Sequence, residues 1–246
     1  MKNKKETEVY RIYNSTSEDM SAVESNTVDF VMFAPPYNIN TPYDDVPLSD
    51  HKSFEEFKEM LSSVIKECFR VLKPGGIFIN ETADTVYSKG KLIALSGLIQ
   101  KLCLDAGFSL KERHINFLQS EKGIELTDKE HNWSPDYYST EDSHSNCHQW
   151  QIFEKGKTEF NQGAGKIFYV NYPSDEDGHP CPFSPEHIKI FLDMGSKNGD
   201  TVLEPFMGTG GMGAEVLKRG GKYIGFELVE KHYNRALKKL EEATNK

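Results

Sequence analysis

A glycine-rich segment in the last third of the chain contains residue types that can bind a nucleotide cofactor. Residues 201–213 (TVLEPFMGTGGMG) follow a short apolar run and precede a predicted helix. Glycines at such a turn let the backbone bend tightly and approach a ligand closely. Glu227 stands about twenty residues beyond the first glycine, where an acidic side chain after the next strand can hold ribose hydroxyls. The spacing therefore predicts a cofactor-binding turn between a strand and a helix.

Two other interpretations fit parts of the same pattern. Gly208, Gly210 and Gly213 match the G-x-G-x-x-G spacing of nicotinamide- and flavin-binding folds. Glu204 counts against those cofactors, because a carboxylate before the turn repels a pyrophosphate but can hold the cationic or amino end of another nucleoside. A tight turn without a ligand is the second alternative, and four glycines with Glu204 and Glu227 in register make it the weaker one.

A second turn with chemical potential, residues 34–38 (APPYN), directly follows the apolar run 28–33 (VDFVMF). Two prolines fix φ and remove two N–H donors, so a rigid row of carbonyl acceptors remains beside an aromatic ring. This arrangement suits a planar ring with an exocyclic amine, because the carbonyls accept from the NH₂ group while Tyr37 stacks on the ring. At the carboxyl end of a parallel strand, such a turn lies where α/β proteins bind ligands.

Alternating helix and strand patterns must position these two turns. Predicted helices cover Phe54–Leu72, Leu92–Ala106, Glu215–Arg219 and Glu230–Ala243, and another begins at Ser184. Predicted strands cover Val28–Phe33, Ile77–Asn80, Phe108–Phe117, Gln149–Phe153, Lys166–Val170, Asp200–Leu203 and Tyr223–Phe226, with a hairpin at Glu154–Lys157. The alternation predicts one α/β domain over residues 1–246 with a doubly wound, mostly parallel sheet. Residues 118–148 are polar and aperiodic, which predicts a substrate-side loop or small recognition insert.

The composition limits the classes of protein to which this chain can belong. With 37% hydrophobic and 27% charged residues, no apolar run of membrane-span length and no apolar leader, the sequence predicts a cytoplasmic protein without membrane contact. None of the four cysteines forms a C-x-x-C pair, so neither a disulfide framework nor a metal site is predicted. Cys68 and Cys103 are expected in the core, and the lone cluster of His144, Cys147 and His148 lacks a second ligand pair.

The net charge of −9 counts against tight nucleic-acid binding by this chain alone. It does not exclude a local basic groove, since the Debye length at cellular salt is only about 8 Å. A protein partner that supplies affinity for DNA, or a homodimer, is therefore an expectation.

The two turns together resemble those of the β-group of DNA amino-methyltransferases, which methylate adenine N6 or cytosine N4 with S-adenosylmethionine. In that group a [D/S]-P-P-Y motif comes first and D-P-F-x-G-x-G comes near the end. This chain has APPY at 34–37 and EPFMGTGG at 204–211, in that order. Five further segments are similar to the family pattern: 11–32, 69–80, 143–157, 179–184 and 226–233. The resemblance implies a Rossmann-like methyltransferase sheet with circularly permuted motif order, opening with a strand and helix over residues 11–32.

The resemblance also implies roles for individual residues. Catalytic roles fall to Ala34, Pro35, Pro36 and Tyr37. Cofactor contacts fall to Ser15, Phe183, Glu204, Phe206, Gly208, Thr209, Gly210, Gly211 and Glu227. Substrate contacts fall to Asn38, Trp133 and His148, with Tyr137 and Tyr138 in the long loop, although those loop aromatics can equally pack the loop onto the core. The implied substrate is double-stranded DNA with the target base flipped out of the helix.

Ala34 departs from the family motif, because the Asp or Ser normally found there accepts a hydrogen bond from the target amine. Three explanations stay open: an engineered inactive form, a natural variant that relies on the carbonyls of Ala34 and Pro35, and a pseudo-enzyme that only binds. The flanking sequence APPYNIN resembles the cytosine-N4 (SPPY) branch more than the adenine-N6 (DPPY) branch. Methylation of RNA or of a small-molecule amine, and a catalytically dead binding subunit, are the alternative functions.

Overall fold

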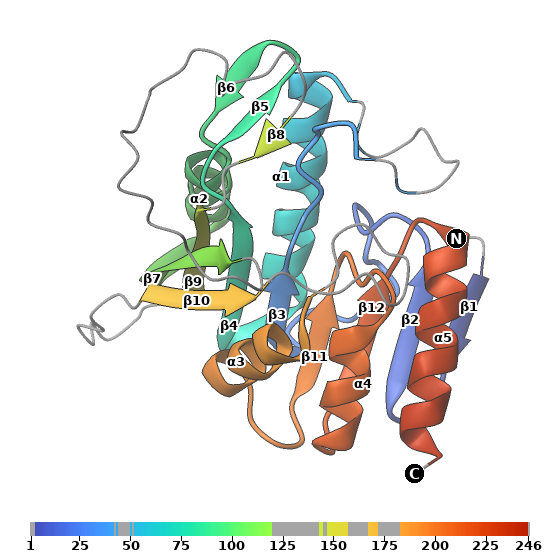
Figure 1. Cartoon of the computed structure of the whole chain (residues 1–246). Coiled ribbons are helices and arrows are strands. Elements are labelled where there is room, and N and C mark those ends of the chain that lie inside the picture. Colours follow the sequence, from blue (N-terminus) through green and yellow to red (C-terminus); the bar gives the residue numbers. More distant parts are fainter. Residues whose placement is uncertain are drawn as a thin grey trace.

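A mixed sheet of nine strands lies at the centre of the described chain (Figure 1). The computed structural model describes residues 3–41, 43, 50, 52–119, 143–144, 147–156, 167–171 and 183–245. The strands of this sheet are β1 (Asn3–Glu6), β2 (Tyr10–Asn14), β3 (Val28–Phe33), β4 (Leu72–Ala83), β7 (Phe108–Gln119), β9 (Cys147–Lys155), β10 (Ile167–Asn171), β11 (Thr201–Glu204) and β12 (Lys222–Phe226). A separate small sheet contains β5 (Val86–Ser88), β6 (Lys91–Ile93) and β8 (Ser143–His144).

The strand order joins the two ends of the chain. In space the order is β1-β2-β12-β11-β3-β4-β9-β7-β10, so the C-terminal strands β11 and β12 lie between the N-terminal strands β2 and β3. The five neighbours β2, β12, β11, β3 and β4 are parallel, and β11 pairs with β3 at Val202–Phe30 and Leu203–Val31. Their carboxyl ends therefore meet at one edge of the sheet, where ligands bind in folds of this type.

Helices cover both faces of the sheet (Figure 1). One face carries α1 (Phe54–Val71) and α2 (Leu95–Ala106), and the other carries α3 (Pro185–Gly195), α4 (Gly211–Lys218) and α5 (Glu230–Thr244). Each face has its own cluster of buried apolar side chains. The prediction of a doubly wound, mostly parallel α/β sheet is confirmed. Buried Cys68 and Cys103 are free thiols in the cluster beneath α1 and α2, which confirms them as core residues.

Local sequence signals explain where the helices begin and end. Ser53 and Glu56 form a capping box at the start of α1, where each side chain accepts from the other residue's backbone N–H. Gly107 ends α2 in the left-handed conformation with φ 105°. Ser184 caps α3 and Pro185 occupies its first turn, as predicted. In the part of the chain that the structure describes, every helix is too short or too polar to cross a lipid bilayer.

The predicted hairpin between β9 and β10 is wrong. Strand β9 pairs with β4 along one edge and with β7 along the other, so no edge remains for β10. Strand β10 instead lies parallel to β7. Sequence periodicity identified these strands, but it carries no information about which neighbours occupy their edges.

The start of α2 is also later than the periodicity predicted. The helical pattern began at Leu92, whereas residues Lys91–Ile93 pair antiparallel with Val86–Ser88 as a hairpin. The turn of this hairpin places Lys89 at φ 49° and Gly90 at φ 78°, the positive values of a two-residue hairpin turn.

The helix implied after the first strand is wrong as well, because residues 15–27 form turns and bends. The carboxylate of Glu67 accepts from the Met20 N–H at 2.8 Å. The guanidinium of Arg70 donates to the carbonyls of Met20 and Val23 at 2.8 and 3.0 Å. These bonds engage backbone groups that a helix would use itself, and the buried side chains of Met20 and Val23 hold the segment against α1.

Candidate active site

The diproline turn and the glycine turn leave neighbouring strands at the same edge of the sheet. Strand β3 leads into residues 34–38, and β11 leads into residues 205–210. The rings of Phe33 and Phe206, one from each strand end, lie 5.5 Å apart between centroids at an angle of 72°. This contact brings the two turns, from opposite ends of the chain, together at one edge. A group bound at one turn therefore lies beside a group bound at the other.

The glycine turn needs its glycines for conformation and for packing. Gly208 and Gly210 have φ values of 51° and 75°, in the left-handed region that side chains disfavour. A Cβ atom on Gly210 would lie 2.8 Å from the Cβ of Ala236, so Gly210 lets the start of α4 approach α5 closely. The turn thus places the N-terminus of α4, with its free amide groups and positive dipole end, at the carboxyl edge of the sheet.

Glu227 connects the end of β12 to the glycine turn. Its carboxylate accepts from the N–H of Gly208 at 2.9 Å and from the N–H of Val229 at 2.8 Å. Burial raises the pKa of Glu227, while these amide hydrogen bonds oppose the shift. The side chain is half-buried, so it supports the turn from within while part of it stays accessible.

Glu204 ends β11 as a buried acid that is 5% exposed. The hydroxyl of Tyr223 donates to its Oε2 at 2.6 Å. Burial raises the pKa of Glu204 to about 8, although the Tyr223 hydrogen bond lowers it. Burial and the adjacent Glu204 carboxyl raise the pKa of Tyr223 well above its usual value. The strand end therefore carries a carboxyl group that a cationic ligand would ionise.

The other predicted cofactor residues lie near the same edge. Ser15 directly follows β2, and Thr209 and Gly211 belong to the glycine turn. Phe183 is half-buried just ahead of α3, with its ring 5.3 Å from that of Phe191. Phe183 packs on the cluster beneath α3, whereas Phe206 packs on the cluster beneath α1.

Asn14 belongs to this site and was missed by the sequence analysis. It ends β2, is 1% exposed, and donates through Nδ2 to the carbonyls of Glu227 and Leu228 at 2.9 and 3.2 Å. Its Oδ1 atom is buried and has no hydrogen-bond partner within the described part of the chain. A polar residue that ends an otherwise apolar strand was the available signal, and Ser15 beside it drew the prediction instead.

In the diproline turn, the structure fixes Tyr37 at both its ring and its hydroxyl. The hydroxyl oxygen accepts from the N–H of Ala83, at the end of β4, at 3.1 Å. The ring lies 6.1 Å from that of His148 in an edge-to-face arrangement of 65°. Ala34, at the start of the turn, is half-buried against the cluster beneath α3.

Asn38 is built into the turn by its own hydrogen bonds. The residue is 3% exposed and has a positive φ of 59°. Its Nδ2 donates to the carbonyl of Lys52 and its Oδ1 accepts from the N–H of Lys52, each at 3.0 Å. The Ser88 hydroxyl donates to the Asn38 carbonyl at 2.5 Å. The carboxamide that was expected to contact the substrate thus joins the turn to the residues before α1.

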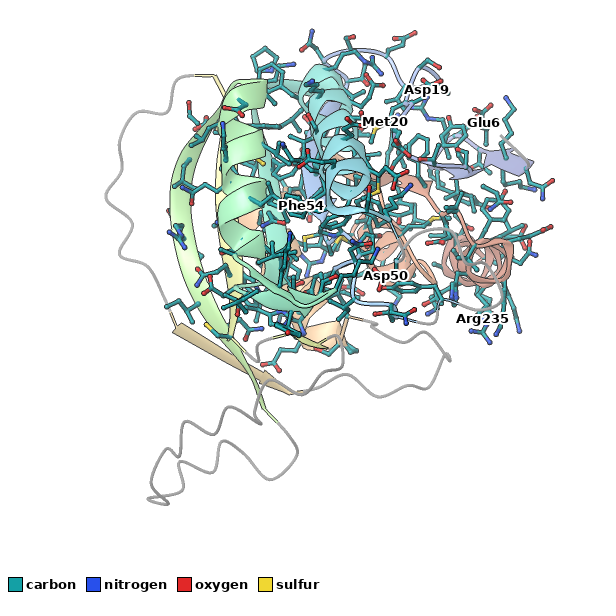
Figure 2. The ribbon with its side chains drawn as sticks, turned by 90° about the horizontal axis from the view of Figure 1, so that it is seen from above. Glu6, Asp19, Met20, Asp50, Phe54 and Arg235 are labelled. Atoms are coloured by element: carbon teal, nitrogen blue, oxygen red, sulfur yellow. The ribbon has the colours of Figure 1, made fainter. Side chains whose placement is uncertain are left out.

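Asp50 holds the same turn and was also missed. Its carboxylate is 3% exposed and accepts from the N–H groups of Asn38 at 2.6 Å, Ile39 at 3.0 Å and Thr41. Figure 2 labels Asp50 together with Phe54, the first residue of α1. All three donors are backbone groups, which explains why no pairing of residue types in the sequence indicated this contact.

A buried acid–imidazole pair adjoins Tyr37. His148, near the start of β9, and Glu81, near the end of β4, are each 5% exposed. Nδ1 of His148 hydrogen-bonds to Oε1 of Glu81. His148 was predicted on the substrate side, whereas Glu81 was not predicted. Trp133, Tyr137 and Tyr138 lie outside the described residues.

A Rossmann-like α/β fold with a glycine turn beside a diproline-aromatic turn is the arrangement expected of a methyltransferase-type site. The model of the N6/N4 methyltransferase family, described as DNA methylase, matches residues 28–239. The chain therefore belongs to this DNA methylase family, whose members methylate amino groups of DNA bases with S-adenosylmethionine as the methyl donor.

Individual relatives agree with this assignment. The chain is 24% identical to DNA adenine methyltransferase YhdJ of Escherichia coli K12, over 95% of this chain and 83% of that protein. It is 25% identical to type II methyltransferase M.BglII of Bacillus subtilis, over 91% of this chain and 66% of that protein. It spans only 55% of M.BamHI of Bacillus amyloliquefaciens, so some relatives contain much additional sequence.

Solved structures share the fold. The cytosine-N4-specific PvuII DNA methyltransferase superposes with a TM-score of 0.69 at 17% identity, over 97% of this chain and 91% of that chain. TTHA0409 of Thermus thermophilus, solved in complex with S-adenosyl-L-methionine, gives a TM-score of 0.68 at 20% identity, over 96% and 94% of the two chains.

Replacing Asp50 by Asn is expected to lower the free energy of unfolding by roughly 1.5–3 kcal/mol, because an amide NH₂ then faces a backbone N–H donor. Methyl transfer to DNA by Asp50→Asn should fall mainly in kcat, since the turn that holds Tyr37 loosens. Asp29→Asn is the matched control, because Asp29 binds Lys73 Nζ at 2.6 Å and the Thr201 N–H at 3.0 Å at the opposite edge of the sheet. If both variants lose stability equally and kcat is the same in both, Asp50 has no positioning role.

Glu204 should make stability fall as pH rises. Its pKa of about 8 in the folded chain exceeds the ordinary value of 4.5, so the folded state binds the extra proton and loses this advantage as pH approaches 8. The expected slope is about 1.4 kcal/mol per pH unit for one proton. Chemical unfolding between pH 6.5 and 7.5 measures it, below the pKa of Glu204 and where His187, whose pKa burial lowers to about 4, is largely neutral. Glu227, whose pKa burial raises to about 7, contributes a slope of the same sign, so Glu204→Gln should remove only the part that is due to Glu204. A slope that Glu204→Gln leaves unchanged would exclude Glu204 as a titrating group.

Proposed function

We propose that this chain transfers a methyl group from S-adenosylmethionine to an exocyclic amine of a base in double-stranded DNA, with cytosine N4 favoured over adenine N6. The observation that carries this proposal is the parallel pairing of β3 with β11, which brings the diproline and glycine turns to one edge. Family membership supports DNA as the substrate. The resemblance of APPYNIN to the SPPY branch and the likeness to the PvuII enzyme favour N4, while YhdJ, named an adenine methyltransferase, represents the N6 alternative.

The groups at the glycine turn fit a cationic nucleoside. Glu204 is a buried acid for the amino or cationic end, and Glu227 is a half-buried carboxylate for the ribose hydroxyls. Asn14 adds a buried acceptor at Oδ1 beside Glu227. Bound S-adenosylmethionine supplies an electrophilic methyl group on its sulfonium. A positive ligand charge stabilises the Glu204 carboxylate, so binding would release its proton.

Aromatic and small residues complete the proposed cofactor contacts. Phe183 and Phe206 present half-buried rings from the two faces of the sheet. Ser15, Thr209 and Gly211 contribute the polar and backbone groups that surround them. These assignments rest on position at the edge of the sheet, together with the family resemblance.

The diproline turn supplies the acceptor side. Tyr37 stacks on a base flipped out of the duplex, and the carbonyls of Ala34 and Pro35 accept hydrogen bonds from its NH₂ group. Asp50 and Asn38 hold the turn rigid through backbone hydrogen bonds. These residues align the amine with the methyl group, so their main contribution is positional. His148 and Trp133 belong to the substrate side in this scheme.

Two observations support alternative functions. Ala34 lacks the acceptor side chain of the family motif, which favours a subunit that binds DNA or a partner protein without turnover. The net charge of −9 favours RNA or a small-molecule amine as substrate, or a partner chain that supplies affinity for DNA. Competition between labelled DNA and RNA in a methylation assay distinguishes the substrates.

Restoring the acceptor tests the function directly. Ala34→Ser and Ala34→Asp are expected to raise methyl transfer to DNA by roughly ten- to a hundredfold, because a lost hydrogen bond in a dry site costs about 1–3 kcal/mol. Exposed Ala22→Ser is the control for a nonspecific effect of the hydroxyl. Tritiated S-adenosylmethionine gives the rate. If neither Ala34 variant transfers a methyl group to any DNA or RNA tested, the chain is not a nucleic-acid methyltransferase.

Gly210→Ala is expected to weaken S-adenosylmethionine binding at least tenfold, because its Cβ would collide with Ala236 and shift the turn. Gly220→Ala is a matched control, since Gly220 has a similar φ of 73° but a Cβ added there would meet nothing within 4 Å. Calorimetry measures both affinities. Equal affinities would show that the glycine turn does not form the cofactor site, and the absence of binding by the unaltered chain at millimolar ligand would exclude the cofactor.

A further inference from the structure

Glu81 and His148 form a buried polar pair, and apolar packing of the sheet does not explain why polar residues occupy these two positions. In the antiparallel register of β4 and β9, Glu81 lies opposite Trp150 and Ala83 lies opposite His148. Trp150, two residues from His148, belongs to the cluster beneath α3, so the pair occupies that face. Burying such groups costs free energy unless they pair, and buried titratable pairs concentrate at functional sites.

The pair is attached to the residue proposed to stack on the base. The His148 ring lies 6.1 Å from the Tyr37 ring, and the Tyr37 hydroxyl accepts from the N–H of Ala83, the residue opposite His148. Ala34 of the same turn packs on the cluster beneath α3, whereas Tyr37 and Ala83 belong to the cluster beneath α1, so the pair and Tyr37 meet at the strand ends where the two faces join. The end of β4 and the start of β9 thus lie together beside the diproline turn.

The other acidic side chains near this edge accept hydrogen bonds from groups outside the Glu81–His148 pair. The Asp50 carboxylate accepts three backbone amides of the turn. Asp84 accepts from the Ser96 hydroxyl of α2 at 2.7 Å, and Glu204 accepts from Tyr223. Within the described residues, Glu81 and His148 therefore form the acid–base pair that contacts Tyr37.

We propose that His148, oriented by Glu81, takes the proton that the amine loses on methylation, in place of the side chain that Ala34 lacks. This inference rests on the proposed function. The amine lone pair forms the C–N bond as the C–S bond breaks and its electron pair stays on sulfur. As positive charge develops on the amine in this transition state, it passes one N–H proton to Nε2 of His148, and the proton reaches solvent when product leaves.

The orientation of the ring gives Glu81 its part in this step. A carboxylate only accepts hydrogen bonds, so the shared proton resides on Nδ1 of His148, and Nε2 becomes the basic atom of the ring. After proton transfer, the Glu81 carboxylate stabilises the imidazolium. Glu81 is thus a positioning residue that acts through His148.

Other charged and titratable groups lie around the Glu81–His148 pair. Tyr37 faces it from the diproline turn, and Asp84 and Cys147 flank the pair along β4 and β9. On the adjacent strand β7, Glu112 and His114 pair at 3.1 Å. His187 of α3 is coupled electrostatically to the pair, but burial lowers its pKa to about 4 and keeps it neutral at neutral pH.

A double-mutant cycle with Ala34 separates a proton acceptor from a structural residue. His148→Asn keeps a donor toward Glu81 but removes Nε2, and single-turnover methylation of DNA should fall by about a hundredfold, a typical contribution of general base catalysis. In the Ala34→Asp background the same change should cost less than about threefold, because the new carboxylate takes the proton. Glu81→Gln should show the same pattern with a smaller loss, of about tenfold. Glu81→Gln is the second variant to measure if His148→Asn does not fold.

His187→Asn is the matched control, because it removes a buried neutral imidazole on the same face that binds Ser184 and Asn116. Any loss it causes should be equal in both Ala34 backgrounds. Suppose instead that His148→Asn reduces the methylation rate by the same factor in the Ala34 chain and in the Ala34→Asp variant, while Ala34→Asp itself still methylates DNA. That result would overturn the role of the Glu81–His148 pair but not the proposed function. No transfer by any variant that still binds S-adenosylmethionine would overturn both.

Discussion

The pairing of β3 with β11 is the constraint on which the rest of the structure depends. Strands from the two ends of the chain lie side by side, with Val31 opposite Leu203 in the buried core. Because both strands run in the same direction, the turn that follows each one emerges at the same edge. The contact between Phe33, the last residue of β3, and Phe206, two residues beyond β11, extends this pairing to the start of the turns. Without it, the diproline turn and the glycine turn would each be an ordinary loop, and a methyl donor at one would have no acceptor beside it.

Both turns are stabilised in the same way, by a carboxylate that accepts backbone amides. Asp50 accepts three amides of the diproline turn, and Glu227 accepts the amides of Gly208 and Val229. A carboxylate can satisfy several convergent N–H donors at once, which a neutral side chain cannot do without leaving a donor unpaired. This explains how two irregular segments at a ligand-binding edge stay ordered without regular secondary structure.

The sequence predicted those features that leave a periodic or compositional signal. The apolar run of β3, the spacing of α1 and the glycines at 208–211 all identified their elements, and the order of the motifs identified the shared edge. The errors share a different cause. The hairpin after β9 failed because edge occupancy depends on distant strands, and the helix after β2 failed because Glu67 and Arg70 bind its backbone. Asp50, Asn14 and Glu81 escaped prediction for the same reason, since their partners are backbone groups or residues that only the sheet register brings near.

The position of the acidic residues changes the meaning of the net charge of −9. Four of the carboxyl groups, those of Asp50, Glu81, Glu204 and Glu227, are wholly or partly buried and bound to interior donors. With a pKa of about 8, Glu204 is also largely protonated at neutral pH, although the formal count treats it as an anion. The net charge of the folded chain is therefore less negative than the composition indicates by the share of Glu204 that stays protonated. The conflict between an acidic composition and a DNA substrate is weaker to that extent, and Glu204 is at the same time one of the groups of the proposed cofactor site.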